Sequence, residues 1–128
     1  FKGTGSEFVS WVLPLLATME RTQHLVGNVL VDVEGERAVS ESYFVASHDL
    51  TDSEGNLRRM TTAGRYLDQF LKHDGDWLIF HRKAVYDWNA NVPRTDNWDR
   101  SKSSERDFGK AGAEDSVYEL GKFLQRPA

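Results

Sequence analysis

The stretch that decides the fold of this chain reads Thr22-Gln23-His24-Leu25-Val26-Gly27-Asn28-Val29-Leu30-Val31. It is a long, mostly apolar run of the kind that forms a strand, and it follows directly on an amphipathic pattern. Its histidine lies where the strand would leave the helix and where a barrel-like pocket would open. Because an imidazole titrates near neutral pH, a histidine held in a pocket can serve as a general base. His24 is therefore the first candidate for a catalytic residue.

The segment before this strand has the pattern of a helix. Thr4 and Glu7 have the spacing of a capping box, in which each side chain bonds the other residue's free backbone amide. Apolar residues then recur three and four positions apart through Phe8, Trp11, Val12, Leu15, Leu16 and Met19. The pattern predicts a helix over about residues 6–20. Pro14 removes one backbone hydrogen bond and predicts a kink or a split.

Four strand patterns follow, over residues 22–33, 37–49, 57–71 and 77–88, with turns at residues 34–36 and 72–76. Strands of about a dozen residues exceed the usual five or six, so the sheet must twist and curl. We expect an α+β fold: a cone-shaped, strongly curved antiparallel sheet of about four long strands, packed against the helix and enclosing a pocket. The cone domain should span residues 1–92. Residues 93–128 should form a polar tail with a short docking helix over Val117, Leu120, Phe123 and Leu124.

Composition excludes several classes of function. The 128 residues carry a formal net charge of −4 with no block of Lys or Arg, so nucleic acid is not an expected partner. The absence of cysteine excludes disulfides and thiolate ligands, no histidine pair has metal-ligand spacing, and no nucleotide-binding motif occurs, so no metal and no cofactor are expected. The longest apolar run, residues 8–17, is too short to span a membrane, and a cytoplasmic location is the default expectation.

Four further residues are candidates for substrate binding. Arg65 lies in mid-strand, where its charge must be paired, with Glu41 or Asp68, or face a wet cavity. Asn28, two positions from Val26, is placed by alternation on the His24 face, where it could donate to a substrate carbonyl or bond neighbouring backbone.

Tyr43 could offer its phenol to a pocket or simply pack. Alternation places His81 on the face of Trp77, Ile79 and Lys83, where it either binds an anion or is a half-exposed surface residue. His48 and His73 lie at strand ends among polar residues and are interpreted as solvated.

Several segments together resemble the SnoaL-like proteins of the nuclear-transport-factor-like superfamily. They are Glu7-Phe8-Val9-Ser10-Trp11, Met19-Glu20-Arg21-Thr22-Gln23-His24, Glu41-Ser42-Tyr43-Phe44, Ala63-Gly64-Arg65-Tyr66-Leu67-Asp68 and Asp74-Gly75-Asp76-Trp77, and the resemblance covers about residues 1–92. The superfamily includes polyketide cyclases, scytalone and bile-acid dehydratases, a dehydrochlorinase and the small subunits of ring-hydroxylating dioxygenases. The resemblance implies an α+β cone for this chain.

The resemblance also implies a function, a cofactor-independent lyase or isomerase of the dehydratase or cyclase type that acts on a small hydrophobic cyclic substrate. His24 matches the histidine that acts as base in the dehydratase-like members. In those members an Asp on an upstream helix orients the histidine, and we expect such an Asp upstream of Phe1, because this chain shows no counterpart. In the dehydrochlorinase-like branch a basic pocket residue corresponds to His81.

Two alternatives remain open: a non-catalytic small (beta-type) subunit of a ring-hydroxylating dioxygenase, and a ligand-binding or assembly module. The outer face of the sheet is apolar enough to predict a homodimer or homotrimer formed through it.

Overall fold

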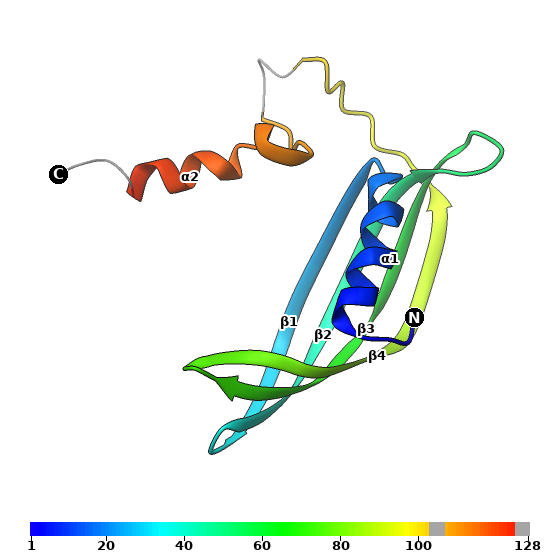
Figure 1. Cartoon of the computed structure of the whole chain (residues 1–128). Coiled ribbons are helices and arrows are strands. Elements are labelled where there is room, and N and C mark those ends of the chain that lie inside the picture. The colour runs from blue at the N-terminus through cyan, green and yellow to red at the C-terminus, as the bar shows by residue number, and fades with distance from the viewer. Residues whose placement is uncertain (103–106, 125–128) are drawn as a thin grey trace. The chain divides into compact units, whose positions relative to one another are not determined.

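The computed structural model describes residues 1–102 and 107–124, with side chains as far as residue 120. It divides into two compact units, Phe1–Arg94 and Thr95–Ala128. The first unit holds one helix and four strands (Figure 1). The second holds a 3-10 turn, Gly112–Glu114, and the helix α2, Val117–Leu124, as the apolar spacing predicts; the side chains of Phe123 and Leu124 lie outside the described residues. Neither helix has the length and apolar composition needed to cross a bilayer.

Helix α1 spans Gly5–Ala17 and begins with the predicted capping box. The Thr4 amide donates to the Glu7 carboxylate at 2.6 Å, and the Glu7 amide donates to the Thr4 hydroxyl at 3.3 Å. The helix is not split at Pro14, and it ends earlier than predicted. At its end the Thr18 hydroxyl and amide both donate to the Leu15 carbonyl, which closes the last turn and releases the chain into the first strand.

The four strands form one antiparallel sheet in the order β1-β2-β3-β4, which confirms the predicted fold class. Their bounds are Arg21–Glu34, Arg37–Thr51, Leu57–His73 and Asp76–Pro93. The turn between β3 and β4 consists of Asp74 and Gly75, both at positive φ, as a two-residue type I′ hairpin turn requires. The sheet is open, with β1 and β4 at its edges.

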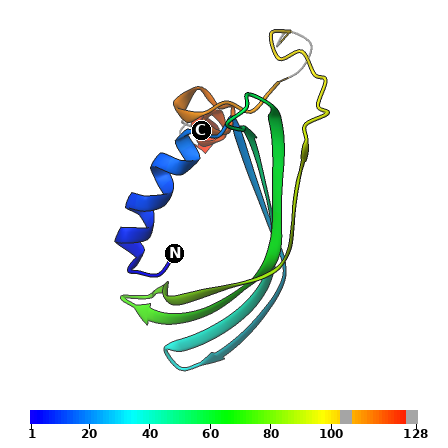
Figure 2. The ribbon, with the colours of Figure 1, turned by 90° about the vertical axis from the view of Figure 1, so that its right-hand side faces the viewer.

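The sheet is strongly curved, and α1 lies on its concave side (Figure 2). On the central strand β2 the even-numbered side chains Ser42, Phe44, Ala46 and His48 are buried, whereas the odd-numbered Val39, Tyr43 and Val45 are exposed. Because curvature crowds side chains on the inside of a sheet, we assign the even-numbered positions of β2 to the concave face. Through the pairing register, Thr22, His24 and Val26 of β1, Tyr66 and Asp68 of β3, and Arg82, Ala84 and Tyr86 of β4 share that face.

Three β-bulges interrupt the alternation of side chains. One lies in β1 between Gly27 and Leu30, and two lie in β4, where Asp87 and Phe80 are the extra residues. The bulge at Phe80 corrects the prediction for His81. Ile79 pairs with Phe70 on the concave face, but His81 pairs with Gln69 on the convex face, so His81 does not share a face with Ile79.

Two buried carboxylates connect the strands through ion pairs. Asp68 on β3 accepts both Nε and Nη2 of Arg82 on β4 at 2.7 Å, and the guanidinium lies 4.1 Å from the centre of the Tyr66 ring. Asp49 on β2 accepts from arginines of β1 and β3. Each of these carboxylates is 3% exposed.

The close approach of the β4 backbone to Gly64 of β3 predicts the effect of one substitution. A Cβ atom at Gly64 would lie 2.1 Å from the Val85 carbonyl oxygen, an atom of the backbone that cannot move aside. We expect Gly64→Ala to lower the free energy of unfolding by about 3 kcal/mol in urea titrations, as overpacking does. Gly27→Ala is the matched control, because nothing lies within 4 Å of its Cβ position. Equal stability of the two variants would contradict the expectation.

Candidate functional site

The feature of the concave face that bears chemistry is a pair of histidines. His24 of β1 and His48 of β2 are diagonal neighbours, since His24 pairs with Ala46 and His48 with Thr22. Their Nε2 atoms lie 3.1 Å apart and their rings meet edge to face at 84°. Two imidazoles at this distance form a hydrogen bond only if one Nε2 carries a proton and the other offers its lone pair.

The prediction that His48 is solvated is wrong, because its side chain is buried, with 8% of the residue exposed. His48 lies near the end of β2, but it continues the buried row of Ser42, Phe44 and Ala46. No alternation in the sequence marks this row as buried, because the exposed Tyr43 and Val45 between its members are themselves apolar. His24, on the edge strand, is exposed. The pair therefore joins an accessible imidazole to a buried one.

The surroundings of His48 determine how the pair is protonated. Burial, and then the nearby charge of His24, lower the pKa of His48 below its usual range, so His48 is neutral at neutral pH. Its Nδ1 is buried and has no hydrogen-bond partner among the described residues. Because an unpaired buried N–H is costly, we assign the proton of His48 to Nε2 and the acceptor role to His24 Nε2.

Aromatic side chains continue the concave face beside the pair. Phe44 is buried between Tyr66, whose ring stacks on it at a centroid distance of 4.3 Å, and Tyr86, which meets it edge to face at 6.2 Å. Burial raises the pKa of the Tyr66 phenol, which keeps it protonated and able to donate. The histidines thus adjoin an apolar surface that carries phenol groups.

The other predicted site residues are not brought together with His24. Arg65 bonds Glu41 at 2.7 Å and lies 6.0 Å from the centre of the Tyr43 ring, and all three side chains belong to the convex face. This is one of the two ion pairs that the sequence predicts for Arg65. His81 is exposed on the same convex face. Asn28 lies within the β1 bulge at φ 51°, so the alternation that linked it to His24 does not continue through its position.

Two other features of the described residues were candidates for a site, a metal-binding cluster and a hollow, and neither adds to the histidine pair. No three His, Asp or Glu side chains of residues 1–102 and 107–124 cluster closely enough to hold a metal ion. A hollow of about 520 Å³ lies between the β1–β2 and β3–β4 turns, lined by Glu36, Arg37, Leu71, Lys72, His73, Leu78, Ile79 and Phe80. It lies at the opposite end of β2 from His48 and does not include the histidine pair.

A curved, open antiparallel sheet with a helix on its concave side is the architecture of an α+β cone protein, and here that side carries the histidine pair. The family of SnoaL-like domains matches residues 2–83, and the chain belongs to this family. A comparison with curated proteins finds no match.

Solved structures share the fold at low sequence identity. The Kfla4162 protein from Kribbella flavida is 17% identical with a TM-score of 0.60, over 66% of this chain and 59% of its own. A proposed scytalone dehydratase from Novosphingobium aromaticivorans is 21% identical with a TM-score of 0.61, over 72% and 61%. A hexachlorocyclohexane dehydrochlorinase, LinA type 2, is 15% identical with a TM-score of 0.61, over 78% and 66%. This chain therefore spans about three fifths to two thirds of the length of these proteins.

The low pKa of His48 predicts a pH dependence of stability. The unfolded chain takes up a proton at this residue near pH 6.5, whereas the folded chain resists it until lower pH. The contribution of His48 to the free energy of unfolding is therefore complete above pH 6.5. It is lost as pH falls through 6.5 towards the lower pKa that His48 has in the folded chain. We expect urea titrations at pH 7.5 and 5.5 to show this loss in the parent protein and in His73→Gln. His48→Gln should show less of it, and an undiminished loss would contradict the assignment.

Proposed function

We propose that this chain carries the proton-transferring site of a cofactor-independent lyase or isomerase that acts on a small hydrophobic cyclic substrate. The observation that supports this best is the 3.1 Å contact between His24 and His48 on the concave face. It offers a lone pair and an N–H donor on adjacent atoms, which is what removal of a proton next to a carbonyl needs. Membership of the SnoaL-like family and the dehydratase and dehydrochlorinase among the similar structures agree with this chemistry.

His24 acts as the base in the proposed reaction. Its Nε2 lone pair takes a proton from the carbon beside the carbonyl, and the electrons of the C–H bond form an enolate. His48 Nε2–H, released from its bond to His24, donates to the enolate oxygen and stabilises its charge. In a dehydration the enolate then expels the hydroxyl group, which leaves as water with the proton held by His24. A carbon–carbon double bond remains and both histidines return to their first state.

His48 is suited to the donor role because it stays neutral. Its lowered pKa keeps it from competing for the proton that His24 receives. In the described residues His24 contacts His48 and no carboxylate. We propose that an Asp outside this sequence orients His24 from its other side, as in the dehydratase-like members of the family. The exposed phenol surface around Tyr86 and the half-buried Tyr66 provide contacts for a flat ring.

A direct test is proton exchange into 2-tetralone, a bicyclic ketone with acidic protons next to its carbonyl. We expect the full-length protein to accelerate deuterium uptake from D2O, followed by NMR, and His24→Gln to lower the enzymatic rate by about 10²–10⁴. His73→Gln is the matched control, because that imidazole is 75% exposed and lies at the far end of β3.

Melting temperatures of the variants separate loss of the base from loss of the fold. A folded His24→Gln protein that exchanges deuterium at the parent rate would refute the role of His24. If the parent protein accelerates deuterium uptake neither by 2-tetralone nor by other cyclic ketones, the proposed chemistry is refuted. That result would favour a binding module or a dioxygenase small subunit.

We also propose that a second copy of the chain covers the convex face in a homodimer or homotrimer. One register row crosses all four strands there with the residues Leu25, Val45, Ala63 and Trp88. Leu25 is 67% exposed and Trp88 54%, and contiguous apolar surface of this kind marks an interface.

Val45→Glu should dissociate that assembly. Gln69→Glu adds the same charge to an exposed position of the convex face outside the row and should not. Light scattering at micromolar concentration measures the outcome. A parent protein that is monomeric there would contradict the proposal.

A further inference from the structure

We infer that Asp49 is a positioning residue that holds the edge strand β1 in the register at which His24 meets His48. The inference concerns the geometry of the imidazole pair, and its bearing on turnover rests on the proposed function. Asp49 lies next to His48 in the sequence but on the opposite face of the sheet, so it acts on the pair through the strands.

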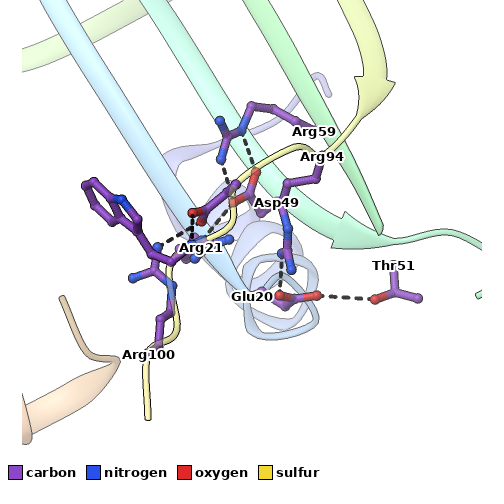
Figure 3. A network of polar contacts seen from close by, with 9 residues as sticks. Glu20, Arg21, Asp49, Thr51, Arg59, Arg94 and Arg100 are labelled. Carbon is purple, nitrogen blue, oxygen red and sulfur yellow. Dashed lines mark hydrogen bonds and ion pairs between the residues drawn. The ribbon is translucent and has the colours of Figure 1, made fainter. Parts of the chain in front are cut away.

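The Asp49 carboxylate connects three strands at one point (Figure 3). It accepts Arg21 Nε of β1 at 2.7 Å, and Arg59 Nε and Nη2 of β3 at 2.7 and 2.9 Å. Its side chain is 3% exposed, and both guanidinium groups lie against it. The hydrogen bonds from Arg59, and then those from Arg21, lower the pKa of Asp49 to about 2, so the carboxylate is charged throughout the working range of pH.

The Arg21–Asp49 contact lies close enough to His24 in the β1–β2 ladder to affect its position. Arg21 and Asp49 form the first pair of the ladder, Thr22 and His48 form the second, and His24 follows two positions later. The backbone amide of Glu20 also donates to the Asp49 carbonyl at 2.9 Å. On the other side of His24 the ladder shifts at the bulge after Gly27. The segment that carries His24 is therefore short, with the Asp49 contact at one end and a bulge at the other.

Side-chain packing adds little to the register of this segment. All side chains from Thr22 to Val26 are exposed, and β1 has a neighbouring strand on one side only. A slip of one residue would turn every side chain of β1 to the other face, and His24 would leave His48 for the convex side. A charge-assisted bond to a fixed, buried carboxylate opposes such a slip, because the bond between Arg21 and Asp49 would break and Asp49 would keep a buried charge with fewer donors.

Asp68 provides a matched comparison for a test. Its carboxylate is also 3% exposed and is bonded by an arginine at two points, but it connects β3 to β4 and makes no bond to β1. Asp49→Asn and Asp68→Asn thus remove the same charge from equally buried sites. Only the first removes a contact of the strand that carries His24.

The readout is the titration of the imidazole nitrogens of His24 and His48, followed by NMR of the 15N-labelled full-length protein. In Asp49→Asn we expect the hydrogen-bonded Nε2 signals to move towards those of free imidazole and the pKa of His48 to rise towards its ordinary value, since His48 gains water and loses His24. In Asp68→Asn the titration should match that of the parent protein. Deuterium exchange into 2-tetralone should fall at least tenfold in Asp49→Asn through kcat, with KM little changed.

Parent-like histidine titrations in Asp49→Asn, or the same change in both variants, would overturn the inference. If Asp49→Asn does not fold, Arg21→Gln replaces it, because it breaks the bond to β1 and leaves Asp49 bonded to Arg59. The expected NMR changes are the same. If the titrations change as expected while the parent protein exchanges no deuterium, the positioning role stands and the proposed function fails.

Discussion

The curvature of a single antiparallel sheet is the constraint on which the rest of this structure depends. Strands of 14 to 18 residues twist too far to form a flat layer, and the resulting curl gives the unit an inside and an outside. The inside holds the buried row Ser42, Phe44, Ala46 and His48 of β2, and α1 lies on that side of the sheet. The pairing register of the strands then determines which side chains lie on that face and can belong to the site.

The sequence predicts the elements well because their signals are local. The capping box of Thr4 and Glu7, the turn at Gly35 and the turn at Asp74-Gly75 act within a few residues, and each forms as expected. The ion pair of Arg65 with Glu41 also follows from a local argument, since a charge in mid-strand needs a partner. The resemblance of these segments to SnoaL-like proteins is confirmed by the SnoaL-like family, which matches residues 2–83.

Assignments to a face of the sheet are less secure, because one bulge reverses them. Counting by twos from Trp77 gives the wrong side for His81, since the extra residue Phe80 has no sequence signal that separates it from its apolar neighbours. The prediction that His48, the partner of His24, is solvated is wrong for another reason. His48 has polar neighbours along the chain, and its burial comes from strands that pair with it from both sides. Only the assembled sheet determines such contacts.

The bulges in β4 also bear on how this fold can diversify. The extra residues Phe80 and Asp87 each reverse the alternation of side chains in β4, so each determines which of the residues beyond it face inwards. Loss of one codon at either position would exchange the inner and outer side chains of a whole segment while leaving the backbone ladder paired. A single deletion can therefore change which side chains of β4 line the concave face, with no substitution of any residue in β4. An edge strand suits such a change, because it has a neighbour on one side only.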